Sequence, residues 1–322
     1  MLDTANATEV FVKREERRAR RREFFRNSGG LGVGLMAGMA LSACGSDNNA
    51  VAQSNAPTDP EILNFALNLE YLEAQFYYYA AYGTGLPADL LPGQGTQGAV
   101  TGGRAVAFKD PVVAQYAREI AQDELAHVKF LRTALGSAAV AQPTIDIDGA
   151  SPTSAFSTAA RAAGLITAGQ AFDPYANDEN FLLGAFIFED VGVTAYKGAS
   201  PLVQNKTFLE AAAGILAVEA YHAGLVRTVL YSKGLTAPAL RTATTAISDA
   251  RDSLDNSADV DQGVVGTADT SNIVPTDVDG IAFSRTPGDV LNIVYLTRDS
   301  VTQGGFFPAG VNGALNLSSA YA

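Results

Sequence analysis

The stretches DELAH, residues 123–127, and EAYH, residues 219–222, contain both histidines of this 322-residue chain. In each stretch a glutamate stands three positions before the histidine: Glu124 before His127, and Glu219 before His222. Positions three apart share one face of an α-helix, so each pair can present a carboxylate and an imidazole to one metal centre. The flanking residues are mostly apolar, which indicates a buried face. A glutamate buried there is costly without a cation, and this favours a metal site over a pair of surface side chains.

Helix-capping residues predict that these stretches lie on the second and fourth of four long helices. The first helix begins at the sequence Thr58-Asp59-Pro60-Glu61, which combines an N-cap residue, a first-turn proline and an acidic first turn. An Asp-Pro pair begins the second helix in the same way, and a glycine follows each helix. The four predicted helices span residues 58–83, 110–136, 177–196 and 206–232.

The connections between the helices predict the architecture. Residues 84–109 form a Gly-rich link, whereas residues 137–176 form a longer link, with a short helix near 154–165, between the second and third helices. A long crossover between two helix pairs is typical of a ferritin-like four-helix bundle, so the sequence predicts an all-α fold of this kind. The predicted parts of the body are a bundle over 58–256, including a fifth helix at 238–254, and an irregular acidic, Gly-rich tail over 257–322, packed on the bundle and with a short helix at 287–296.

The first and third helices supply carboxylates for the same centre. Glu70 and Glu73 lie in the middle of the first helix, and Glu189 lies near the predicted end of the third, all in apolar surroundings. Two helices that give one glutamate each and two that give Glu-x-x-His form the ligand set of a carboxylate-bridged dimetal site. Glu70 is favoured over Glu73 by its position along the helix. Glu70 lies about as far before the end of the first helix as Glu124 lies after the start of the second, so the two are level in an antiparallel pair. Glu73 is the alternative, as an outer or shared ligand.

Three other side chains near these ligands each have two interpretations. Tyr77 stands seven residues beyond Glu70 on the same helix face, where its hydroxyl can donate to a ligand or act as a catalytic donor. It is otherwise a core aromatic in the run 76–79. Asp123 and Asp190 adjoin ligands in the sequence, and each either orients the histidine of a facing helix or is a solvated carboxylate.

Composition limits the functions open to the chain. The formal net charge is -12, and without residues 1–43 it is about -15, since eight of the 22 basic residues lie in that segment. Such an acidic body argues against nucleic-acid binding, which needs a basic surface. The single cysteine, Cys44, excludes both a disulfide framework within the chain and a Cys-rich zinc or iron–sulfur site.

The N-terminal segment has the order of an export signal. Eight basic residues precede an apolar, Gly-rich stretch at 29–43, which is too short and too weakly apolar to span a bilayer. Arg21 and Arg22, followed by Glu-Phe-Phe-Arg, resemble the twin-arginine signal of proteins that are exported already folded. The twin-arginine (Tat) translocation machinery is therefore an expected partner.

A possible lipid attachment site follows the apolar stretch. Leu-Ser-Ala before Cys44 resembles the lipobox of bacterial lipoproteins, which makes Cys44 the acylated first residue of the mature chain. Residues 44–57 are then a polar tether, and the membrane is a partner through the lipid anchor. A free or buried thiol, in a signal that is cleaved elsewhere, is the alternative. The expected location is the periplasm or cell envelope.

Several segments resemble a known family. Residues 61–83, with DELAHVKFL, FIFEDVGVTAY and AVEAYHAGLVR, resemble the ferritin-like superfamily, and more closely its branch of plant desiccation-related proteins and bacterial ferritin-like lipoproteins. AFSRTPGDVLNIVY and GGFFPAGVNG in the tail are similar to the same branch, so the resemblance covers about residues 58–315. It implies a di-iron or dimanganese centre whose ligands are Glu70, Glu124, His127, Glu189, Glu219 and His222.

Two functions compete at this point. The first is a dimetal redox enzyme for stress protection, which turns over peroxide or oxygen or oxidises ferrous iron, because carboxylates with a few imidazoles suit iron and manganese. The second is a non-catalytic stress protein of the envelope, in which the metals stabilise the bundle. Storage of iron in a closed cage fits poorly with a lipid anchor and a long tail, although a homo-oligomer is possible.

Overall fold

The computed structural model describes residues 56–256 and 258–321. The predicted export signal with Arg21 and Arg22, the predicted lipid attachment site Cys44 and all but the end of the predicted tether lie outside these residues. The described part is mainly helical, with two short strands, and this confirms the predicted all-α fold.

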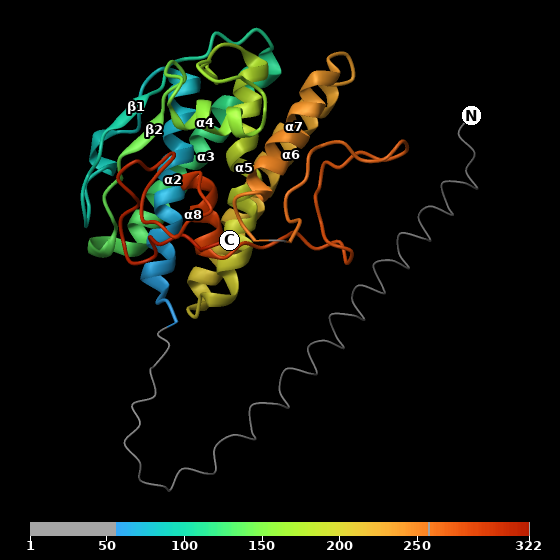
Figure 1. Ribbon diagram of the computed structural model, residues 1–322. Helices are drawn as coiled ribbons and strands as arrows, with labels where there is room; N and C mark the ends of the chain where they lie inside the picture. The colour runs from blue at the N-terminus through green and yellow to red at the C-terminus, as the bar shows by residue number, and fades with distance from the viewer. Residues whose placement is uncertain (1–55, 257, 322) are drawn as a thin grey trace, which may run out of the picture. The chain divides into compact units, whose positions relative to one another are not determined.

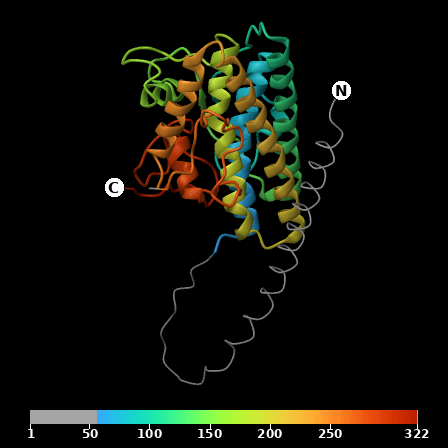
Figure 2. The same ribbon diagram turned by 90° about the vertical axis from the view of Figure 1, so that its right-hand side faces the viewer.

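Four long helices form the bundle: α2 (Asp59–Tyr82), α3 (Pro111–Leu135), α5 (Asp178–Ala199) and α6 (Lys206–Lys233). Figure 2 shows them side by side, with α2 paired to α3 and α5 paired to α6. The predicted bounds agree within three residues. The largest difference is at the end of the third helix, which continues through Gly198. Glu189 therefore lies in the middle of this helix rather than near its end.

Local capping explains why these bounds could be predicted. The backbone N–H and the hydroxyl of Thr58 donate to the Glu61 carboxylate at 2.7 and 2.8 Å, which fixes the start of α2. Asp110 accepts from the backbone N–H of Val112 at 2.9 Å at the start of α3. Gly83 ends α2 with a φ of 74°, a left-handed conformation that glycine adopts without strain.

The links contain one short α-helix, α4 (Ala155–Ala162), two 3-10 turns at Ala88–Leu90 and Gly136–Ala138, and two strands that the sequence did not predict. Strand β1 (Val100–Gly102) lies in the first link and β2 (Ile145–Ile147) in the second, and they pair in parallel (Figure 1). Each strand has three residues, too few for a periodic pattern to show. A Cβ at Gly102 would lie 2.3 Å from the Cα of Asp148, so glycine is what lets the two links approach.

Helices α7 (Pro238–Asp252) and α8 (Pro287–Tyr295) lie with the tail on one side of the bundle (Figure 2). Buried ion pairs join these segments: Arg285 binds Asp255 at 2.7 Å and Asp261 at 2.9 Å, and Arg251 also binds Asp261. Removing one partner from such a network strands a buried charge, so these pairs fix the position of the tail.

An aromatic core closes one region of the bundle interior. The ring of Phe76 on α2 contacts those of Phe156, Tyr175 and Phe188 at centroid distances of 5.4, 5.7 and 5.6 Å. Phe306 of the tail contacts Phe188 at 4.9 Å, so the tail is part of the same core. These rings exclude water from the interior next to α2 and α5.

Helix α6 is the one described helix that is long and apolar enough, by length and composition, to cross a membrane. It also carries Glu219, His222 and Arg227, all buried in the protein. Two of these buried residues, Glu219 and His222, are predicted ligands, so one face of α6 packs in the interior of the bundle.

Candidate metal centre

All four long helices direct predicted ligands into the bundle interior. The most exposed of the six side chains is His127, at 8%, and the others are exposed by 2% or less. The structure therefore brings together every predicted ligand: Glu70 from α2, Glu124 and His127 from α3, Glu189 from α5, and Glu219 and His222 from α6.

One group of these side chains surrounds a first cation position. The Nδ1 atom of His127 lies 3.1 Å from Glu70 Oε2, 3.6 Å from Glu124 Oε2 and 3.8 Å from Glu219 Oε1. These four residues offer ligand atoms that all lie within 4.8 Å of one another. Three carboxylates and one imidazole can therefore hold a single ion.

A second position lies beside the first. His222 Nδ1 lies 3.1 Å from Glu124 Oε1 and 3.7 Å from Glu189 Oε2, and Glu189, Glu219 and His222 offer ligand atoms within 4.8 Å of one another. Glu124 directs one oxygen toward each histidine, and Glu219 belongs to both groups. Glu124 and Glu219 therefore lie between the two groups, whereas Glu70 and Glu189 each belong to one of them.

Several of these atoms are buried without a hydrogen-bond partner in the described part of the chain: both carboxylate oxygens of Glu124 and Glu219, Glu189 Oε2 and His222 Nδ1. An unsatisfied buried polar atom costs about 1–3 kcal/mol, and more when it is charged. Cations bound at the two positions would give these six atoms the partners that they lack. The donor set, oxygen with some imidazole nitrogen, fits iron or manganese.

Two tyrosines support the two outer carboxylates. The Tyr77 hydroxyl donates to Glu189 Oε1, and the Tyr196 hydroxyl donates to Glu70 Oε1. Each tyrosine follows the ligand on its own helix by seven residues and reaches the ligand of the other helix. Tyr77 is therefore both a core aromatic and a donor to a predicted ligand. Sequence reasoning missed Tyr196, although the same spacing of seven after Glu189 marks it.

The remaining candidates have different roles. Asp123 Oδ2 lies 3.2 Å from His222 Nε2, and this contact orients the imidazole so that Nδ1 faces the ligands, as one of its two interpretations predicts. Asp190 does not contact a histidine; it pairs instead with Arg227 at 2.7 Å and Arg251 at 3.1 Å. Glu73 is buried beside the six ligands.

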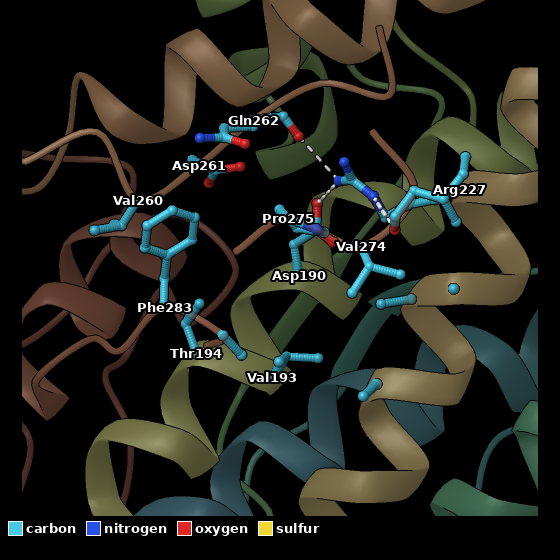
Figure 3. A pocket seen from close by; sticks show the side chains of 15 residues that line it. Asp190, Val193, Thr194, Arg227, Val260, Asp261, Gln262, Val274, Pro275 and Phe283 are labelled. Atoms are coloured by element: carbon cyan, nitrogen blue, oxygen red, sulfur yellow. Dashed lines mark hydrogen bonds and ion pairs between the residues drawn. The ribbon is translucent and has the colours of Figure 1, made fainter. Parts of the chain in front are cut away.

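Asp190 belongs to a second polar cluster outside the metal centre. Figure 3 shows Asp190 and the Arg227 guanidinium at a cavity of about 90 Å³ between α5, α6 and the tail. Arg227 also donates to the backbone carbonyls of Gln262, Gly263 and Ile273. Its donors are occupied by the tail, so Arg227 holds that segment in place.

Burial raises the pKa of four carboxyls in the centre, because the charged form loses its solvation. The pKa of Glu70 rises to about 7 and that of Glu189 to about 8. Burial, with the nearby charge of Glu124, raises the pKa of Glu73 and Glu219 well above its usual range. Without a metal, these groups keep protons at pH values where exposed glutamates are ionised.

Glu124 differs from the other four carboxyls. Burial by itself would raise its pKa, but the contacts with His127 and His222 hold it far below the usual value. Burial likewise opposes the charged imidazoles, yet the facing carboxylates raise the pKa of His127 to about 11 and that of His222 to about 10. Protons therefore occupy, in the metal-free protein, the place that cations fit.

The metal-free protein is expected to lose stability as the pH rises from 5 to 8. Glu70 and Glu189 have raised pKa values in the folded state, to about 7 and about 8, so the folded protein binds more protons than the unfolded chain in this window. Stability then falls with rising pH, and the melting temperature should drop by about 5 °C or more. Thermal melts at several pH values check this. Metal-loaded protein is the control, and its melting temperature should not drop, because cations replace the protons. A melting temperature of the metal-free protein that rises with pH would contradict the expectation.

Comparisons with known proteins agree with this geometry. A family model described as a ferritin-like domain matches residues 58–232. The ferritin-like catalase Nec2 of Nesocodon mauritianus is 28% identical over 281 residues, which cover 84% of this chain and 87% of that protein. The desiccation-related protein PCC13-62 of Craterostigma plantagineum is 31% identical over 245 residues, 71% of this chain and 75% of that protein. No solved structure matches the chain. By these matches, the chain belongs to the ferritin-like family, in the branch that includes the desiccation-related proteins.

Proposed function

We propose that this protein is a dimetal enzyme that disproportionates hydrogen peroxide. The observation that supports the proposal is the pair of adjoining residue groups around Glu124 and Glu219, since two ions bound there would lie side by side and could act on one substrate. When bound, two iron or manganese ions would pass electrons between two peroxides. One peroxide would take up two electrons and two protons to become two waters, and the second would return two electrons to the ions, release two protons and become dioxygen. The similarity to a protein named a ferritin-like catalase supports this choice of reaction.

The residues around the two positions suit a small substrate. Tyr77 and Tyr196 hold the outer carboxylates by donating hydrogen bonds, and the other oxygen of each carboxylate faces a histidine: Glu70 Oε2 faces His127, and Glu189 Oε2 faces His222. His127 is the most exposed of the six ligands, at 8%, so all six are largely shielded from solvent. The Asp123 side chain beside His222 is 44% exposed, so this face, between α3 and α6, is the route that we assign to peroxide.

Oxygen release is the test of the proposal. Protein loaded with iron or with manganese should release one dioxygen for every two peroxides, and metal-free protein should release none. An oxygen electrode measures the rate, with free metal at the same concentration as the background. Bound metal with no oxygen release would contradict the proposal. A large fall in melting temperature on metal removal would then favour the alternative, a non-catalytic stress protein in which the metals are structural.

The same proposal includes export. The twin-arginine motif at Arg21 and Arg22 and the lipobox at Cys44 support passage through the Tat machinery and attachment to the envelope membrane. Export of the folded chain would let the protein bind its metals in the cytoplasm, before transport. Replacement of Cys44 by alanine should release the protein from the membrane fraction of the producing cell, whereas continued membrane attachment would argue against a lipid anchor.

A further inference from the structure

A cleft lies between α2 and the two links, and it shares no lining residue with the metal centre or with the cavity in Figure 3. Helix α2 contributes Gln75 and Tyr79, and the links that contain β1 and β2 (Figure 1) form its other walls, with residues 97–100 and Gln142 among them. Its volume is about 540 Å³. This lies within the range of about 300–1,000 Å³ that small-molecule sites occupy.

The cleft is polar but carries no charge. Its polar side chains are three glutamines, Gln75, Gln97 and Gln142, together with Tyr79, and none of its lining residues is Asp, Glu, Lys or Arg. An amide and a phenol hydroxyl each both donate and accept hydrogen bonds, so they match a ligand whose own groups do both, as hydroxyls do. A charged ligand would lose its hydration here without gaining an ion pair.

Two buried glutamines form a fixed floor. Gln75 is 2% exposed and Gln142 is 1% exposed. The Gln75 amide donates to Gln142 Oε1, and its oxygen accepts from the backbone N–H of Leu86 at 3.2 Å. Gln142 Nε2 donates to the carbonyl of Gly98 at 3.3 Å. Each amide has a second N–H, which has no partner among the described residues. These amides are held in place before a ligand arrives, so binding costs them little side-chain entropy.

Tyr79 and Gln97 add polar groups that are also unpaired. In the described part of the chain, neither the Tyr79 hydroxyl nor the Gln97 amide makes a hydrogen bond, and both line the cleft. A Cβ at Gly103 would lie 2.5 Å from Tyr79 Cγ, and one at Gly85 would lie 3.1 Å from the Tyr79 hydroxyl oxygen. The two glycines therefore let the first link pack directly against this ring. Tyr79 presents an apolar body with a polar tip.

We propose that this cleft binds a neutral sugar. The sugar hydroxyls exchange hydrogen bonds with the glutamine amides and the Tyr79 hydroxyl, and its C–H surface contacts the ring of Tyr79 and the leucines of the cleft, Leu86 and Leu91. A free disaccharide and the end of a neutral glycan chain present the same groups. The inference does not rest on the proposed function, because the cleft and the metal centre have no residue in common.

Ligand-observed NMR spectroscopy on the full-length protein tests the inference, with maltose, glucose, glucuronate and the long glucan amylose as probes. Maltose and glucose should bind at millimolar concentration. Glucuronate differs from glucose by a carboxylate and should bind more weakly by about tenfold or more, because the cleft has no cation to pair with it. Amylose that binds more tightly than maltose would identify a glycan chain as the ligand, and equal affinity per site would identify the free sugar.

A double variant, Tyr79→Phe with Gln97→Ala, removes unpaired polar groups and leaves the buried floor intact. Its affinity for maltose should fall by about tenfold or more, since each lost hydrogen bond weakens binding several-fold. Gln115→Ala is the control, because Gln115 is an exposed glutamine on α3 outside the cleft, and its affinity should not change. Circular dichroism checks that both proteins are folded.

Three results would overturn the inference. The first is wild-type protein that binds none of the neutral probes at millimolar concentration. The second is a folded double variant that binds maltose as tightly as the wild type does, which would place any sugar elsewhere. The third is glucuronate that binds as tightly as glucose, which would show that the absence of charge in the cleft does not select its ligand.

Discussion

Glu124→Gln is expected to abolish oxygen release from peroxide and to remove both metal ions from the protein. Glu124 directs Oε1 to within 3.1 Å of His222 Nδ1 and Oε2 to within 3.6 Å of His127 Nδ1, so it faces both cation positions. Glutamine has the same shape, but one of its two donor oxygens becomes an NH₂ group that cannot bind a cation. One substitution therefore removes a charge and a bridge from both positions at once.

Metal content per chain and the oxygen-release rate measure this effect. We expect affinity for the metals to fall by at least about 100-fold, because even residues outside the ligand set contribute 10- to 100-fold. Glu119→Gln is the matched control, since Glu119 lies on the same helix and is exposed to solvent. The control should keep its metals and its activity. A Glu124→Gln protein with two bound ions and activity within threefold of wild type would exclude Glu124 as a bridging ligand.

Much of the helical framework could be predicted because its signals are local. The contacts of Thr58 with Glu61, and of Asp110 with Val112, involve residues two or three positions apart, so the sequence alone shows where the helices begin. The strands β1 and β2 gave no such signal, since their pairing joins residues more than 40 positions apart. A three-residue strand has too few positions for its alternation to be recognised.

The site was predictable for a related reason. Glutamate and histidine three positions apart mark one helix face, and scarce histidine made the two pairs informative. The partners of Asp190 could not be predicted, because Arg227 on α6 and Arg251 on α7 lie 37 and 61 positions away in the sequence, where no local pattern links them to Asp190. Tyr196 could have been found by applying to α5 the spacing that identified Tyr77 on α2.

Gly192 shows what the pattern of charged residues cannot reveal, since its importance lies in an absent side chain. Gly192→Ala is expected to lower metal affinity by about 100-fold or more. Loss of a residue that only orients a ligand lowers it by about 10- to 100-fold, and here a ligand itself would be displaced. The added Cβ would lie 2.3 Å from Glu219 Oε2, so the carboxylate that is shared by both cation positions must move. Helix propensity alone predicts that Gly192→Ala stabilises the protein, because alanine in a helix interior is favoured over glycine by about 1 kcal/mol.

A second glycine separates these two effects. Gly214 lies on α6, and its added Cβ would meet no atom within 4 Å beyond its chain neighbours and the adjacent backbone of its own helix, so Gly214→Ala should gain the helix propensity and keep both ions. Circular dichroism checks that both variants are folded, and metal analysis after dialysis measures the affinity. If Gly192→Ala retains its metals as Gly214→Ala does, the Glu219 carboxylate can rotate away without loss, and Glu219 is not a bridging ligand. If only Gly192→Ala loses them, the space at position 192 is a requirement of the metal centre that helix stability cannot explain.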